Sequence, residues 1–176
     1  MFEVEYEFGE EDLIHFNSER YMKTEEYQND MRKNRLIVPA VLVFISAFYY
    51  FYYQDLNTSV YIVVIALLWA LFIPKTILSR WQHKLLSSYT PKEKLNMFGA
   101  YSLSIDPANP NFLFETSPSG KNKMPWADLV RVEYAKRYVY IYINLDTALV
   151  IPVDKVKQGD LEKFAEQAEK MIDRFA

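Results

Sequence analysis

Two adjacent apolar blocks in the first half of the chain most strongly constrain its fold. The first block, Leu36–Tyr53, and the second, Leu56–Pro74, contain no charged residue. Eighteen helical residues span about 27 Å, close to the roughly 30 Å hydrocarbon core of a bilayer. A chain of 176 residues is too short to surround two such helices with protein. The blocks therefore predict a transmembrane hairpin over residues 36–78, with helices at 36–53 and 57–76.

Basic residues predict the orientation of this hairpin. Both outer ends carry them, before the first block and after the second: Arg32, Lys33, Arg35, Lys75, Arg80 and Lys84. The loop between the blocks, residues 54–59, has none. Because cytoplasmic flanks are enriched in Lys and Arg, we expect a multi-pass membrane protein with both termini in the cytoplasm.

The interior of the two blocks favours an anchor over a transport device. Neither block holds an ionisable residue at mid-depth, where proton relays and ion pathways normally need one. Ser46 and Trp69 are polar-capable residues within the blocks, and we expect both to pack between the helices. The bilayer lipid is thus the first predicted partner.

The region after the hairpin, residues 85–176, changes to the alternating pattern of β-strands. Apolar residues alternate with polar ones between turn-forming segments, which predicts an antiparallel meander. Residues 159–175 then repeat apolar side chains at helical spacing. The predicted fold class is a membrane α-helical hairpin plus an α+β domain. That domain is expected to be an antiparallel, pleckstrin-homology-like (PH-like) β-sandwich or barrel closed by the C-terminal helix.

The N-terminal segment, residues 1–35, predicts a strand followed by a charged, partly amphipathic helix. Four apolar residues between Phe2 and Phe8 alternate with three glutamates, and residues 10–35 follow as the helix. A lone strand is not stable. The strand therefore pairs with an edge of the C-terminal sheet, the favoured alternative, or adds to the sheet of another protein.

Several ordered motifs resemble those of a known family. They are Glu3–Phe8, Glu11–Phe16, Met124–Leu129, Tyr138–Tyr142 and Val150–Pro152. In this order they resemble the YcxB-like family, small bacterial membrane proteins with two transmembrane helices and a C-terminal PH-like domain. The resemblance implies a fold and a location in the bacterial inner membrane, but no settled activity.

Two aromatic groups are candidates for an interaction surface. Trp126 is expected to fill the core and Asp128 to satisfy turn N–H groups, and a ligand groove shaped by the two is the alternative. Tyr138, Tyr140 and Tyr142 fall on one face of the strongest predicted strand. This stripe is either a contact surface or packs beneath the N-terminal strand or the closing helix.

Three basic residues, Arg131, Lys136 and Arg137, are candidates for contact with anionic lipid headgroups. A solvated basic edge is the alternative. The acidic run Glu10–Asp12, at the start of the predicted N-terminal helix, is expected to complement the helix dipole.

Composition narrows the classes of function. The chain has no cysteine, and His15 and His83 lie too far apart in sequence to suggest a metal site. Residues 75–176 carry fifteen basic and twelve acidic side chains, too small an excess to predict nucleic-acid binding. No glycine-rich phosphate loop or nucleophile elbow is present. We therefore expect no enzyme, no cofactor and no metal.

The leading functional hypothesis is a non-enzymatic, membrane-anchored adaptor or regulator. Its cytoplasmic PH-like domain would bind a protein partner or another copy of the chain. Two alternatives stay open. One is self-protection against a membrane-active peptide, and the other is a module that binds anionic lipids through the basic edge.

Overall fold

The computed structural model describes residues 2–175, which form two compact units. The sheet unit combines both ends of the chain, residues 2–16 and 89–175, and the hairpin unit comprises residues 17–88. Met1 and Ala176, the outer ends of the predicted segments 1–35 and 85–176, lie outside the described residues.

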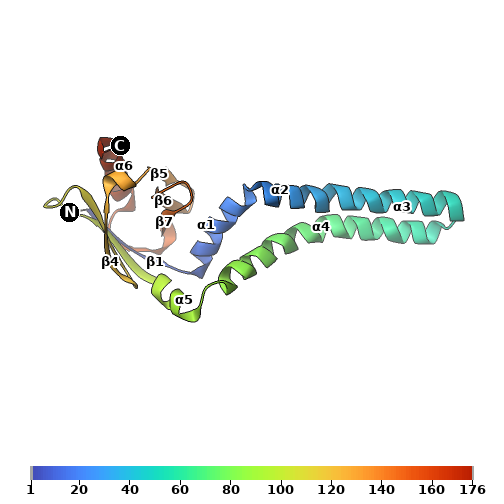
Figure 1. The fold of residues 1–176 in the computed structure, drawn as a ribbon, viewed down its shortest axis with the longest axis horizontal. Coiled ribbons are helices and arrows are strands. Elements are labelled where there is room, and N and C mark those ends of the chain that lie inside the picture. The colour runs from blue at the N-terminus through green and yellow to red at the C-terminus, as the bar shows by residue number, and fades with distance from the viewer. Residues whose placement is uncertain (1, 176) are drawn as a thin grey trace. The chain divides into compact units, whose positions relative to one another are not determined.

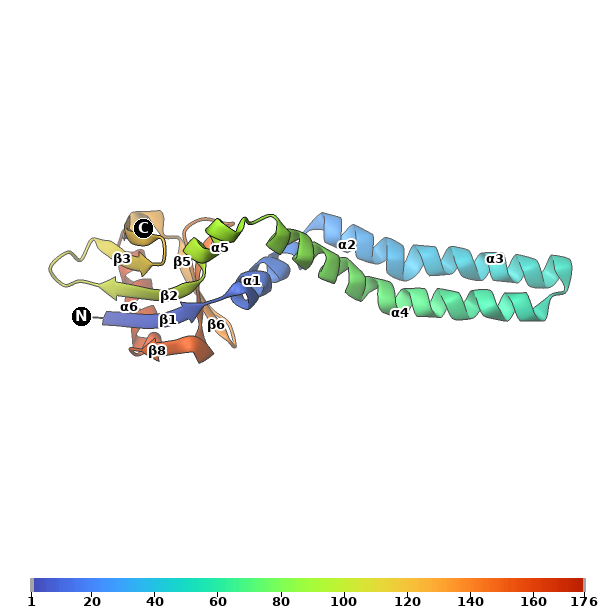
Figure 2. The ribbon, with the colours of Figure 1, turned by 90° about the horizontal axis from the view of Figure 1, so that it is seen from below.

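The hairpin unit contains two long apolar helices, as predicted. The first, Glu25–Tyr53, is continuous through three parts, and the second is α4 (Leu56–Ser87); both are long and apolar enough to cross a membrane. The three parts are α2 (Glu25–Arg32), the π-helix η1 (Lys33–Ile37) and α3 (Val38–Tyr53). α3 and α4 lie side by side (Figures 1 and 2). Gln54 adopts a left-handed conformation that ends α3, and the Asp55 side chain caps α4.

One buried hydrogen bond joins α3 to α4. The Ser46 hydroxyl donates to the Ser59 carbonyl at 2.7 Å, and both residues are buried. The predicted packing between helices is therefore confirmed for Ser46, and for Trp69, which is 38 % exposed, it stays a prediction.

The predicted single helix over residues 10–35 is wrong, because it is interrupted. α1 (Glu10–Met22) ends before α2 begins. The Thr24 side chain accepts a hydrogen bond from the Tyr27 N–H at 3.3 Å, and Glu25 and Glu26 occupy the first turn of α2. A threonine cap followed by acids starts a new helix at this point.

The sheet unit contains two antiparallel sheets and a C-terminal helix, which agrees with the predicted α+β arrangement. The five-stranded sheet has the order β4 (Gly120–Pro125), β3 (Phe112–Ser117), β2 (Gly99–Ile105), β1 (Phe2–Phe8) and β8 (Val156–Gln158). The three-stranded sheet has the order β5 (Arg131–Tyr134), β6 (Tyr138–Tyr142) and β7 (Ala148–Pro152). The remaining elements are α5 (Pro91–Met97), the 3₁₀ turns η2 (Trp126–Asp128) and η3 (Val153–Lys155), and α6 (Leu161–Phe175).

The N-terminal strand β1 lies inside the larger sheet, between β2 and β8 (Figure 2). It pairs with β2 from Phe2 opposite Ile105 to Phe8 opposite Gly99. Val4, Tyr6 and Phe8 point into the core. The strand predicted at residues 2–8 therefore pairs within its own chain.

The core lies where the two sheets and α6 meet. Leu103, Leu113, Ile141 and Ile151 come from the sheets and are fully buried. α6 adds the apolar stripe Phe164, Ala165, Ala168, Met171 and Ile172. Burial of these side chains, worth about 1.5–3 kcal/mol for each large one, holds the layers together.

The close approach of β1 to Gly159 generates the first prediction. Gly159 has φ +95°, and a Cβ there would collide with the backbone of Glu3. We expect Gly159→Ala to lower the free energy of unfolding by about 2–3 kcal/mol. Gly9→Ala is the control, because the nearest atom to its Cβ would be 3.6 Å away. Denaturant unfolding of the detergent-solubilised protein measures both, and equal losses would contradict the prediction.

Candidate functional site

The η2 turn separates Trp126 from Asp128. Trp126 is 1 % exposed, and its indole N–H donates to the Pro110 carbonyl at 2.9 Å. Asp128, at the other end of the turn, is exposed. The two side chains therefore do not line a common groove, and Trp126 fills the core.

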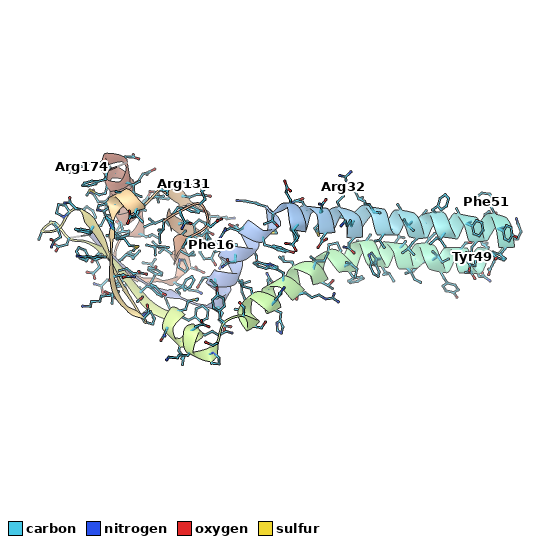
Figure 3. All side chains as sticks on the ribbon, in the orientation of Figure 1. Phe16, Arg32, Tyr49, Phe51, Arg131 and Arg174 are labelled. Carbon is cyan, nitrogen blue, oxygen red and sulfur yellow. The ribbon has the colours of Figure 1, made fainter. Side chains whose placement is uncertain are left out.

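The tyrosine stripe of β6 packs beneath α1. Tyr138 and Tyr140 are buried, and Tyr142 is half-buried. The His15 ring stacks on Tyr138 at 4.6 Å between centroids, and Phe16, labelled in Figure 3, contacts Tyr140 at 5.4 Å. Of the two roles considered for the stripe, packing is therefore the one that describes Tyr138 and Tyr140. The stacking rings come from α1, however, and not from the N-terminal strand or the closing helix that the sequence suggested.

Asp12 is the centre of a buried polar cluster at the start of α1. It is 1 % exposed. One carboxylate oxygen accepts from the Gly9 N–H at 2.8 Å and from the Lys155 ammonium at 2.7 Å. The other accepts from the Tyr138 hydroxyl at 3.2 Å. The cluster joins the N-terminal segment to β6 and η3, and its groups satisfy one another.

The charges in this cluster are mutually stabilised. Burial, followed by the nearby Asp12 carboxylate, raises the pKa of Tyr138 to about 12. Burial alone would lower the pKa of Lys155, but its hydrogen bonds to Asp12 and Glu11 outweigh burial and raise the pKa. The Asp12 cluster therefore forms a structural clamp between α1, β6 and η3.

Asp12 and Glu11 provide a matched test of this clamp. Both carboxylates lie 2.7 Å from the Lys155 ammonium, but Glu11 is 79 % exposed. We expect Asp12→Ala to lower the free energy of unfolding by about 3–5 kcal/mol, because it removes the carboxylate that accepts hydrogen bonds from buried donors. Glu11→Ala is expected to cost less than about 1 kcal/mol. Denaturant unfolding followed by tryptophan fluorescence compares them, and similar losses would refute a buried clamp.

The three basic candidates do not form one patch. Arg131, labelled in Figure 3, lies on β5. It pairs with Glu133 at 3.3 Å and stacks over the Tyr142 ring. Arg137 lies in the turn that joins β5 to β6 and pairs with Asp154 at 3.0 Å. Lys136 is exposed in that turn. Two of the three charges therefore already have acidic partners.

A groove between α6 and the smaller sheet was not predicted. It has a volume of about 500 Å³. Its apolar lining includes Tyr134, Val139, Val153 and Leu161, and its acidic lining is Glu162, Glu166 and Glu169. Tyr134 and Val153 are about half exposed, so apolar surface is accessible beside three carboxylates.

The electrostatic environment of this α6 groove is negative. Burial, then the carboxylates of Glu169, Glu166 and Glu162, raises the pKa of Tyr134. The glutamates follow the spacing i, i+4 and i+7, which places them on one stripe of α6. This spacing of the glutamates is visible in the sequence. It did not predict the groove, because an acidic stripe on a helix normally faces only water. Within residues 2–175, no cluster of three or more His, Asp or Glu side chains is arranged to hold a metal ion.

The comparisons with known proteins bear on the sheet unit. The family model described as YcxB-like protein matches residues 108–168. This confirms the predicted resemblance to the YcxB-like family over β3 to β8 and the first half of α6. No curated protein and no solved structure matches the chain significantly.

Proposed function

We propose that this YcxB-like chain is a non-enzymatic membrane adaptor of the bacterial inner membrane. The apolar hairpin anchors it, and the sheet unit, a PH-like domain, binds a protein partner in the cytoplasm. One observation carries this proposal: the chain leaves the sheet unit after β1 and returns to it before β2 by way of two long apolar helices.

The surface of the hairpin unit supports insertion into a bilayer. In the most apolar eighteen-residue stretch of each long helix, only 6 % and 11 % of the residues are buried. A core helix of a soluble domain is buried on most of its surface. Phe51, near the turn between the helices, is 74 % exposed (Figure 3). Lipid contact accounts for this exposed apolar and aromatic surface.

The pairing of β1 with β2 supports an even number of spans. Hydrogen-bonded neighbours lie on the same side of a membrane, so β1 and β2 share one compartment. Two crossings, one by each long apolar helix, return the chain to that compartment, as this pairing requires. Arg32, Arg35 and Lys75 flank the two spans, which favours the cytoplasm as the shared compartment.

The absence of cysteine from the sequence permits a direct test of this topology. Asn57→Cys places a thiol in the loop between the helices, and Ala108→Cys places one in the exposed β2–β3 turn. We expect an impermeant maleimide to label the first variant in intact cells, and the second only after permeabilisation. The reverse pattern would overturn the orientation. Recovery of the protein in the soluble fraction would overturn the anchor.

The α6 groove is the proposed partner site of the domain. Its apolar surface and its row of glutamates complement a peptide segment that carries Lys or Arg beside an apolar side chain. An ammonium or guanidinium group would lie among the carboxylates while the neighbouring side chain covers Val153 and Leu161. Charge-assisted hydrogen bonds of this kind are about twice as strong as neutral ones.

A photo-crosslinking residue at Val153 tests the groove in living cells. We expect the crosslinked segment, sequenced by mass spectrometry, to contain Lys or Arg next to an apolar residue. Glu166→Gln with Glu169→Gln should reduce the yield about tenfold, the effect of losing about 1.4 kcal/mol.

Asp128→Asn with Asp173→Asn is the matched control for that experiment, since both acids are exposed and neither lines the groove. A crosslinked segment without basic residues would contradict the proposed site. So would an equal loss of yield in the control variant.

A further inference from the structure

The helix that enters the first apolar block carries a second, oppositely charged groove. It has a volume of about 580 Å³ and is lined by Tyr27, Gln28, Met31, Arg32, Arg35 and Leu36. We propose that this arginine groove binds the phosphate of an anionic phospholipid at the cytoplasmic interface. The inference depends on the proposed membrane anchor, but it adds a specific ligand site.

The two arginines have free donors for such a ligand. Among the described residues 2–175, neither Arg32 nor Arg35 takes part in an ion pair. Both are exposed, and Figure 3 shows Arg32 turned away from α4. Each guanidinium presents a planar fork of N–H groups that matches phosphate oxygens. The paired arginines of the sheet unit, Arg131 and Arg137, lack this freedom.

A distortion of the backbone accompanies the groove. Pro39 lies four residues after Arg35 and has no N–H to donate to the Arg35 carbonyl. The backbone hydrogen bonds of the helix shift accordingly, and the Val38 N–H donates to the carbonyl of Lys33, five residues earlier. This π-helical turn, η1, contains Arg35 and follows Arg32 directly. Single π-turns inside helices occur frequently at functional sites.

The order of side chains along this helix matches the order of groups in a phospholipid. Tyr27 and Gln28 come first, the two arginines follow, and Leu36 begins the uncharged block. At 1.5 Å per residue, Arg35 lies at the edge of the hydrocarbon region, where headgroup phosphates are found. Met31 and Leu36 add apolar surface for the glycerol and first methylene groups, which free phosphate lacks. Basic pockets at this depth commonly bind anionic headgroups.

Lipid titration of the purified, full-length protein tests the site. Native mass spectrometry measures binding of dioleoyl phosphatidylglycerol, with dioleoyl phosphatidylcholine and inorganic phosphate as comparison probes. We expect Arg32→Gln with Arg35→Gln to weaken phosphatidylglycerol binding roughly 30-fold, from the contribution of two basic residues at an anionic surface. Arg32→Lys with Arg35→Lys keeps the charge but loses the fork, so we expect an intermediate affinity.

The matched control is Lys75→Gln with Arg80→Gln. It removes the same charge from the part of α4 that follows the second apolar block, where both residues are exposed and outside the groove. We expect less than a threefold change. Equal losses in the two glutamine variants would overturn the site in favour of a general charge effect. If the Arg32→Gln, Arg35→Gln variant does not fold, the Arg32→Lys, Arg35→Lys variant provides the test. Wild-type affinity of that lysine variant for phosphatidylglycerol would overturn the proposed site.

The comparison probes separate the remaining outcomes. Equal binding of inorganic phosphate would reassign the site to a soluble anion, and equal binding of phosphatidylcholine would remove the requirement for a net negative lipid. Either result overturns the proposal. Failure of the membrane anchor itself is seen separately, because the protein would then be recovered in the soluble fraction before any titration.

Discussion

The pairing of β1 with β2 is the interaction on which the rest of the structure depends. It joins strands separated by about 90 residues, and closing a flexible loop of that length costs about 4 kcal/mol. The hairpin unit is not a flexible loop, because its two ends are held together. Tyr21 stacks on Trp81 at 4.4 Å, and the Gln82 amide donates to Ser18 at 3.0 Å. Helix pairing thus lowers the closure cost of the sheet, and the sheet in turn opposes separation of the helices.

The Asp12 cluster adds a second connection between the N-terminal segment and the remainder of the sheet unit. Backbone hydrogen bonds hold β1 in the larger sheet, whereas Asp12 bonds to Tyr138 of the smaller sheet and to Lys155. Buried ion pairs add little net stability but are costly to break. The clamp therefore specifies where α1 begins more than it strengthens the fold, and it orients α1 over the tyrosine stripe.

The fold was predictable where periodicity alone determined the structure. The alternation at residues 2–8 and the uncharged blocks gave β1 and the long helices, since both signals are local. The break at Thr24 and the short helix α5 were missed, although each carries a threonine cap; Thr90 and Glu93 form a complete capping box. Tyr138–Tyr142 remained ambiguous, because both faces of a strand rich in aromatic and β-branched residues suit burial. The structure buries both faces of this strand, and the tyrosine face is covered by α1.

The candidate sites were harder to predict, because the binding capacity of a charge depends on its neighbours in space. Arg131 and Arg137 belong to a basic segment by composition, yet Glu133 and Asp154 already pair with them. Arg32, by contrast, enters sequence reasoning only as a topology signal, and the structure shows that it has no ion-pair partner among residues 2–175. An unpaired guanidinium keeps its full interaction with an incoming phosphate, whereas a paired one must first lose a partner. The ligands proposed for the arginine groove and for the glutamate-lined α6 groove therefore carry opposite charges, so neither proposed site would compete for the ligand of the other.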